Sequence, residues 1–156
     1  AVVASPWLLK ASGTPQTTGD LARFTLIEAG DAHRSANLDW LSWRRWFDAQ
    51  GCGQLQPKRW LYFNYAHQIV QAALAGQGLA LARMPLIADA LASGNLVEVM
   101  PGHRLESPLA YWLLTGPRSS QRPEIQAFCA WLALEAESTR QAIGDMPDPD
   151  TLASPD

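Results

Sequence analysis

The sequence has few of the residues, and none of the spacings, that metal sites and disulfide frameworks need. Its two cysteines, Cys52 and Cys129, stand far apart and form no CxxC pair. We therefore predict neither a disulfide framework nor a zinc site. The three histidines, His33, His67 and His103, are scattered along the chain. We expect them at the solvated surface, not as metal ligands or catalytic groups.

Positive charge and long apolar runs are also scarce. Twelve lysines and arginines against fifteen aspartates and glutamates give a net charge of −3 and a pI near 5.5. Nucleic-acid-binding surfaces are usually basic, so this balance argues against DNA binding by the chain itself. No apolar run reaches the ~18 residues of a membrane span, and no secretory leader stands at the start. The hydrophobic content of 47% is typical of a globular domain.

Catalytic signatures are missing as well. Ser5 lies in no GxSxG turn and has no evident His/Asp partner, so we predict no nucleophile. Gly76 and Gly78 follow a predicted helix, whereas the glycines of a dinucleotide-binding loop follow a strand. We therefore expect no enzymatic activity, no catalytic residue, no cofactor and no metal.

The most informative stretch of the chain begins at Trp60. Trp60–Phe63 is bulky, as a strand is, and Asn64 is predicted to cap the next helix with its side-chain oxygen. Apolar residues then recur at helical spacing: Ala66, Ile69, Val70, Ala73 and Leu74. Phe63 and Asn64 are thus expected at the carboxyl end of a strand, where open α/β sheets bind small ligands.

The same stretch then returns to the sheet. The glycines at 76 and 78 end the helix, because glycine readily adopts the left-handed conformation of a C-cap. Leu79–Ala82 is apolar throughout, as a strand covered on both faces is. Pro85 opens a second helix, where its missing N–H costs nothing. This β-α-β-α order predicts an α/β fold with right-handed crossovers.

Further elements are predicted on both sides of this stretch. Strands are expected at residues 1–4, 24–28, 96–100 and 109–114. Helices are expected over residues 38–49 and from Pro123. The tryptophans of the earlier helix are expected to pack in the core or at an interface: Trp40, Trp43 and Trp46. The apolar face of the later helix comprises Ile125, Phe128, Cys129, Leu132 and Ala136. The acidic, proline-containing stretch from Gly144 is expected to be a disordered tail.

In this order, the segments resemble the C-terminal effector-binding half of LysR-type transcriptional regulators. The resemblance covers about residues 1 to 140, within the branch that includes the glycine-cleavage activator and the β-lactamase regulator. The segments that carry it are SPWLL, GDLARFTLIE, WLSWRRWFDAQG, the stretch from LYFNYAH to EVMPG, LAYWLLTGP and PEIQAFCAWLALE. The most specific piece is AALAGQGLAL, followed by a proline-led helix and SGNLV.

The resemblance implies a periplasmic-binding-protein-like α/β fold with two Rossmann-type lobes and a mixed sheet. A small-molecule effector binds between the lobes and changes how a tetramer holds DNA. It assigns residues 1–110 to effector-binding lobe II, residues 111–143 to a strand and helix that return to lobe I, and residues 144–156 to the tail. The first half of lobe I and the DNA-binding domain are expected to be absent, with a fragment boundary at Ala1. DNA contact is then expected only through the absent N-terminal domain, in the cytoplasm, with no membrane partner.

The resemblance also assigns the ligand-contacting side of lobe II to five residues: Ser5, Pro6, Phe63, Asn64 and Arg83. Helix N-termini near Ser5 and Asn64 favour a carboxylate by roughly 0.3–1 kcal/mol each. Phe63 can contact the body of the effector, and Arg83 can pair with a carboxylate through two hydrogen bonds. A carboxylate-bearing effector is therefore expected. The purely structural alternative is that Ser5 and Asn64 only cap helices and that Arg83 is a surface charge.

Two other functions are compatible with a small α/β chain. A solute-binding protein of a transport system has the same two-lobed architecture and is the main alternative; the missing leader argues against it. A small α/β enzyme has no constellation of residues to support it.

Without the rest of lobe I, the apolar face of the last helix lacks partners. We therefore expect self-association as a dimer or tetramer, exchange of elements between chains, or a covering segment outside this sequence.

Overall fold

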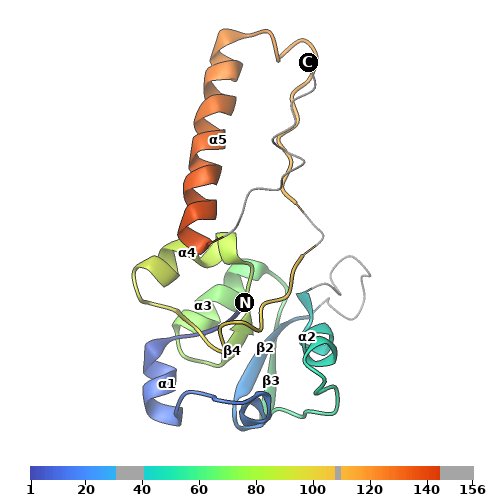
Figure 1. The fold of residues 1–156 in the computed structure, drawn as a ribbon, viewed down its shortest axis with the longest axis vertical. Coiled ribbons are helices and arrows are strands. Elements are labelled where there is room, and N and C mark those ends of the chain that lie inside the picture. The colour runs from blue at the N-terminus through green and yellow to red at the C-terminus, as the bar shows by residue number, and fades with distance from the viewer. Residues whose placement is uncertain (31–40, 108–109, 145–156) are drawn as a thin grey trace. The chain divides into compact units, whose positions relative to one another are not determined.

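The computed structural model describes residues 1–30, 41–107 and 110–144 (Figure 1). The chain forms two compact units, Ala1–Ser107 and Pro108–Asp156. The first unit carries all the strands of the described residues, and the second carries the longest helix. Each unit is described by itself below.

A mixed five-stranded sheet forms the centre of the first unit. Its strands, in chain order, are β1 Val2–Ala4, β2 Thr25–Ala29, β3 Arg59–Phe63, β4 Leu79–Leu81 and β5 Val97–Glu98. Their spatial order is β3-β2-β4-β1-β5. Strand β2 runs parallel to β3 and β4, whereas β1 is antiparallel to β4 and β5. The mixed sheet and the α/β class are as predicted, although the last strand is shorter than its expected span of 96–100.

The strand directions decide which loops meet. Ala29 pairs with Phe63, and Ile27 pairs with Ala80, so the carboxyl ends of β2, β3 and β4 lie along one edge of the sheet. Strand β1 runs the other way and pairs Val2 with Leu81. The carboxyl end of β1 therefore lies at the opposite edge.

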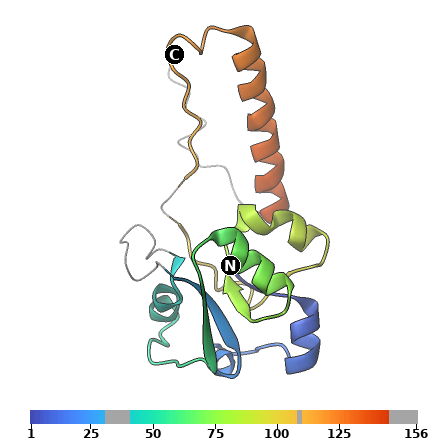
Figure 2. The ribbon, with the colours of Figure 1, turned by 180° about the vertical axis from the view of Figure 1, so that it is seen from behind.

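Helices cover both faces of this sheet. They are α1 Pro6–Ser12, α2 Trp43–Ala49, α3 Ala66–Leu74 and α4 Met84–Ala92, with a 3₁₀ helix at Thr18–Arg23. Figures 1 and 2 show α2 and α3 on opposite sides of β2. No helix within the described ranges is long and apolar enough to cross a membrane.

The core has one layer on each face, because successive strand residues point to opposite faces. On one face, the aromatic side chains of α2 pack against β2 and β4. This layer includes Trp43, Trp46, Phe47, Leu26, Leu79 and Leu81. On the other face, α3 and α4 pack against the alternate strand residues. That layer includes Ile69, Val70, Ala73, Ile87, Val3, Ile27 and Ala80.

The two tryptophans of α2 pack against each other, and each also donates a hydrogen bond. Their rings meet edge to face, with centroids 5.6 Å apart, and neither side chain is exposed to solvent. Trp43 Nε1 donates to the carbonyl of Ile27 at 2.8 Å, and Trp46 Nε1 donates to the carbonyl of His103 at 2.7 Å. Buried indoles need such acceptors, so α2 is fixed to both β2 and the loop after β5. The prediction that Trp43 and Trp46 belong to the core is confirmed.

The turn between α3 and β4 requires glycine twice. Gly76 has φ of +70°, and a Cβ there would lie 2.4 Å from the ring of Trp7. A Cβ on Gly78 would lie 2.5 Å from the carbonyl oxygen of Thr25 on the neighbouring strand. The first glycine allows the left-handed turn, and the second allows β4 to approach β2 closely.

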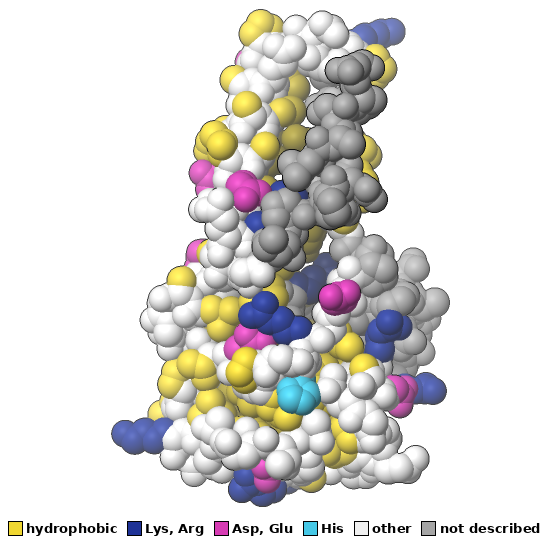
Figure 3. Space-filling model, viewed as in Figure 1, with side chains coloured by type: hydrophobic (Ala, Val, Ile, Leu, Met, Phe, Trp, Pro, Cys, Tyr) yellow, Lys and Arg dark blue, Asp and Glu magenta, His cyan; other side chains and the backbone are white. Residues whose placement is uncertain are grey.

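The second unit contains helix α5 at Pro123–Ile143, which begins at the predicted proline. The strand predicted at 109–114 is wrong for residues 110–114, which form no regular element; Leu109 lies outside the described residues. Trp112 and Leu114 are 79% and 86% exposed. A strand needs a neighbour to satisfy its backbone groups, and this segment pairs with none in the described chain. Figure 3 shows hydrophobic side chains on the surface along α5.

Four further predictions need correction or fall outside the described residues. The helix expected over 38–49 begins at Trp43, and its predicted first residues, with Trp40, lie among the undescribed residues 31–40. Asn64 does not cap α3, because the N-cap residue is Tyr65, whose side chain makes no capping hydrogen bond. The predicted tail at 145–156 and His33 also lie outside the described residues.

Candidate functional site

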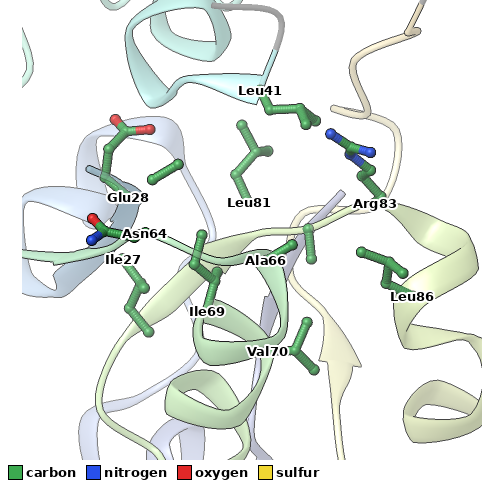
Figure 4. Close-up of a pocket in the computed structure, with 12 residues that line it drawn as sticks. Ile27, Glu28, Leu41, Asn64, Ala66, Ile69, Val70, Leu81, Arg83 and Leu86 are labelled. Atoms are coloured by element: carbon green, nitrogen blue, oxygen red, sulfur yellow. The ribbon is translucent and has the colours of Figure 1, made fainter. Parts of the chain in front are cut away.

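A pocket opens at the edge where the parallel strands β2, β3 and β4 end. It encloses about 90 Å³ (Figure 4). Its walls come from the ends of β2 and β4, the start of α3, the start of α4 and Leu41, two residues before α2. The lining residues are Ile27, Glu28, Ala29, Leu41, Asn64, Ala66, Ile69, Val70, Leu81, Ala82, Arg83 and Leu86.

The sheet geometry explains why the pocket forms there. Strands β2 and β3 stay paired as far as Gly30, whose N–H donates to the Phe63 carbonyl at 2.7 Å, and the helices that follow them in the chain, α2 and α3, lie on opposite faces of the sheet. Diverging connections leave a crevice outside the carboxyl ends of the strands, which is the usual ligand position in open α/β sheets. Asn64 lies at this crevice close to Gly30. A Cβ on that glycine would approach Asn64 Oδ1 to 3.0 Å, so a side chain at position 30 would crowd the amide.

Most of the pocket wall is apolar. The α3 side contributes Ile69 and Val70, the strands contribute Ile27 and Leu81, and α4 contributes the exposed Leu86. Such a surface suits the hydrocarbon or ring portion of a small molecule, because its burial gains roughly 25 cal/mol per Å².

Two charged side chains interrupt the apolar wall. Glu28 near the end of β2 is only 2% exposed, and the backbone N–H of Trp43 donates to both carboxylate oxygens at 3.3 and 3.4 Å. Arg83 is half-buried and stands at the N-cap of α4. In Figure 4, Glu28 and Arg83 lie on opposite sides of Leu81. The pocket therefore offers a negative and a positive group at separate points of an apolar surface.

The predicted site residues divide between the two edges of the sheet. Asn64 and Arg83 line the pocket. Phe63 is the residue before Asn64 and does not line the pocket. Its half-buried ring packs against the core layer that contains α3. Ser5 is buried and caps α1, accepting from the N–H of Leu8 at 3.3 Å.

The structure does not bring Ser5 and Pro6 to this pocket. They follow β1, which is antiparallel to β4, so they lie at the opposite edge of the sheet. Near that edge, a Cβ on Gly76 would come within 3.2 Å of Ser5 Oγ. The expectation that all five residues share one surface of this unit is therefore corrected for these two.

Glu28 and Leu41 are pocket residues that the sequence did not single out. Glu28 closes the predicted strand 24–28, and a charged residue at the carboxyl end of a buried strand was the available signal. Leu41 had no comparable signal, because its position depends on where α2 begins. Among the described residues, no cluster of three histidine, cysteine or acidic side chains is placed to hold a metal ion.

Comparison with known proteins assigns the chain to a family. The model of the LysR substrate binding domain matches residues 1–136. The chain belongs to the LysR substrate-binding domain family. This confirms the resemblance and the periplasmic-binding-protein-like fold class, and it favours a regulator over a transport protein.

The similar proteins of this LysR family are transcriptional regulators. The glycine cleavage system transcriptional activator of Escherichia coli K12 is 27% identical over 139 residues, which are 89% of this chain and 43% of that protein. The HTH-type transcriptional regulator TrpI of Pseudomonas aeruginosa is 29% identical over 130 residues, 83% of this chain and 41% of that protein. These relatives are regulators and not enzymes, in agreement with the prediction of no enzymatic activity.

A solved LysR-family structure shows the same fold. The effector domain of the transcriptional regulator AmpR of Pseudomonas aeruginosa superimposes with a TM-score of 0.55 at 25% identity. The match covers 90% of this chain and 63% of the AmpR structure. Measured against the two curated regulators above, the chain spans less than half of their length.

Proposed function

We propose that this chain is the effector-sensing part of a LysR-type transcriptional regulator and that the effector binds at the carboxyl ends of β2 and β4. Family membership over residues 1–136 supports the regulatory role. The pocket supports the location, because it combines an apolar wall with charged and amide groups at one end of the sheet.

The pocket residues have separate roles in this proposal. The Arg83 guanidinium holds a carboxylate of the effector, since its planar fork can form two parallel hydrogen bonds. Each hydrogen bond to a charged group is worth about 1.5–3 kcal/mol. Asn64 supplies an amide that can donate or accept, and Ile69 and Leu81 contact the body of the effector. Phe63 fixes the start of the loop that carries Asn64.

DNA binding belongs, in this proposal, to a part of the regulator outside this chain. The similar proteins TrpI and DsdC bear the designation HTH-type transcriptional regulator, and the chain covers 41% and 43% of their length. The chain's net charge of −3 does not suit a DNA contact surface. An effector acts by binding one arrangement of the regulator more tightly, and it shifts the equilibrium by no more than that difference in affinity. Regulation of transcription then takes place in the cytoplasm.

The second unit is proposed to complete the other lobe. Residues 111–143 expose large apolar side chains, among them Trp112, Leu114, Phe128 and Trp131. Exposed apolar surface of this kind favours association. We assign this segment to lobe I, where the remaining part of the effector domain covers it, and we expect the regulator to be a dimer or tetramer.

A binding experiment on the full-length regulator tests the proposal. The regulator is titrated into DNA from upstream of its own gene in a mobility-shift assay. Candidate small molecules are screened for binding to the regulator by thermal shift. The proposal expects specific DNA binding, and at least one small molecule that both stabilises the protein and changes the DNA complex. A protein that binds no DNA, or whose DNA binding responds to none of the molecules that stabilise it, would contradict it.

A further inference from the structure

We propose that the segment Met100–Leu105, called the strap below, is a latch with a closed and an open state. In this proposal the latch couples the pocket to the chain that leads into the second unit. The inference rests on the proposed function and specifies how binding at the same site is transmitted. Three observations support it: backbone strain in the strap, the attachment of the strap to α2, and the contact of α2 with the pocket.

The strap begins at the edge of the sheet where the pocket opens. Strand β1 pairs Val2 with the pocket residue Leu81, and the Val99 N–H donates to the Val2 carbonyl at 2.8 Å. Met100 therefore leaves the sheet at the level of the pocket. Met100 and Leu105 then pack against the core layer that contains α2. The first unit ends two residues after the strap, so the strap immediately precedes the connection to the second unit.

The closed strap is strained. Met100 has φ of +62°, and it is the one non-glycine residue with positive φ in the part of the chain that the structure describes. In this conformation the Cβ crowds the following carbonyl oxygen, which disfavours it by roughly 5- to 30-fold. His103 Nδ1 is buried and has no hydrogen-bond partner among the described residues. A buried nitrogen without a partner favours a conformation in which water reaches it. Both features favour opening of the strap.

Hydrogen bonds hold the strap closed against this strain. The indole N–H of Trp46 on α2 donates to the His103 carbonyl at 2.7 Å, and the centroids of these two rings are 6.4 Å apart. The His103 N–H donates to the Met100 carbonyl at 3.2 Å and closes a turn. The Arg104 guanidinium donates to both carboxylate oxygens of Glu98 at 2.8 and 2.7 Å. A strained segment held by such contacts has two accessible states, so a change in one contact shifts their populations.

Helix α2 links the strap to the pocket. Leu41, two residues before α2, lines the pocket (Figure 4), and the backbone N–H of Trp43 donates to the pocket residue Glu28. Trp46 lies about one turn further along α2, and its ring meets the Trp43 ring edge to face. A molecule that packs against Leu41 therefore acts on the helix that holds the strap. It steadies the start of α2 and favours the closed state.

The state of the strap sets the freedom of the connection that follows it. A closed strap is fixed to α2 and to the sheet, so the free connection between the two units is short. An open strap adds its own residues to that connection and allows the two units a wider range of arrangements. Effector binding at the pocket then narrows this range, which is a shift of population between existing states.

Hydrogen–deuterium exchange on this chain tests the strain without any ligand. Exchange over residues 99–107 reports opening of the strap, and exchange over β4 reports the stability of the sheet. Met100→Gly removes the strain, whereas the matched control Met100→Ala shortens the same side chain and keeps the strain. We expect strap exchange about two- to fivefold slower for the glycine variant than for the alanine variant, because the greater freedom of glycine in the open state offsets part of the gain. Equal exchange, or faster exchange for the glycine variant, overturns the latch.

Trp46→Phe tests the attachment to α2. The variant keeps a ring in the core but loses the N–H that holds the His103 carbonyl. We expect strap exchange to rise by about threefold or more, measured relative to β4. The matched control is Trp43→Phe, which loses the same kind of hydrogen bond, made to the Ile27 carbonyl on β2. An equal rise at the strap in both variants would show that Trp46 is not the attachment.

Leu41→Ala tests the coupling from the pocket end. This change weakens the contact at the start of α2, so strap exchange should rise. The matched control is Leu86→Ala, because Leu86 also lines the pocket but belongs to α4. We expect strap exchange in this control to stay within error of the unaltered chain. If both variants or neither of them changes strap exchange, the path through α2 is wrong.

The full-length regulator separates this inference from the proposed function. In mobility-shift titrations, Met100→Gly compared with Met100→Ala, and Trp46→Phe compared with the unaltered regulator, should change DNA affinity in opposite directions. Shifts of the same sign, or no shift, would overturn the regulatory role of the latch and leave the proposed function standing. An unaltered regulator that binds no DNA would contradict the proposed function, and the exchange results on this chain would still decide the latch. Melting temperatures identify any variant that fails to fold.

Discussion

The close approach of β4 to β2 predicts a strong effect for one small substitution, Gly78→Ala. A Cβ at this position would lie 2.5 Å from the carbonyl oxygen of Thr25, 3.1 Å from its carbonyl carbon and 3.2 Å from Cγ1 of Ile27. The nearest two atoms belong to the backbone of β2 and cannot rotate away. The two strands must therefore move apart, and their pairing brings Glu28 and Arg83 to the same pocket.

The expected loss follows from the cost of overpacking. An added methyl group in a filled interior destabilises by about 1–3 kcal/mol, and a backbone neighbour points to the upper part of that range. The matched control is Gly19→Ala, because the nearest atom to a Cβ there is Thr17 Oγ1 at an ordinary 3.7 Å. An exposed change of this kind should stay within about 0.5 kcal/mol.

The assay is urea unfolding followed by far-ultraviolet circular dichroism, with both variants measured beside the unaltered chain. We expect the unfolding midpoint to fall clearly for Gly78→Ala and to stay within error for Gly19→Ala. If the two variants unfold alike, the close β2–β4 approach is not a feature of the folded protein. The geometry argued for the pocket would then lose its basis.

Three further predictions concern other parts of the chain. Ser5→Ala should destabilise the fold by about 0.5–2 kcal/mol, since Ser5 caps α1, without changing effector affinity; thermal unfolding and calorimetry check the two halves. The hydrogen bonds from Arg104 lower the pKa of the Glu98 carboxyl below its ordinary value of 4.5. The pair therefore stabilises the folded state fully at pH values above 4.5. This contribution is lost as the pH falls through the lowered pKa. Arg104→Gln should therefore lose a small amount of stability at pH 7 and less at low pH, measured by urea unfolding at each pH, and a constant difference would contradict the pairing. Phe128 and Trp131 of α5 are 53% and 52% exposed, and in this chain studied alone, without the segment proposed to cover them, their replacement by serine should reduce self-association in sedimentation experiments; unchanged association would place the contact elsewhere.

Local sequence patterns were sufficient to predict the helices and strands that are buried within the first unit. The helical spacing that ends at Leu74 and the apolar run Leu79–Ala82 correspond to α3 and β4 almost residue for residue. Ser5 caps α1 as predicted, because the serine–proline pair fixes both the cap and the first helical residue. Asn64 failed as a cap because Tyr65 is still extended, with φ of −124° and ψ of 141°, which moves the helix start beyond its reach.

Strand direction and pairing were beyond the reach of local patterns. Nothing in the residues of β1 shows that it runs antiparallel to β4, and this direction places Ser5 at the edge away from Asn64. Glu28 became a pocket residue only through the register of β2 with β4. The segment Ala110–Leu114 has the composition of a strand, but a strand forms only where a neighbour supplies hydrogen bonds.

Hydrogen–deuterium exchange on the full-length regulator, with and without a molecule that alters its DNA complex, tests the location of the effector most directly. We expect slower exchange at residues 64–70 and 81–86, which include most of the residues that line the pocket. We expect no change over α1 at the opposite edge of the sheet. Protection confined to residues 5–12, with the pocket segments unaffected, would contradict it.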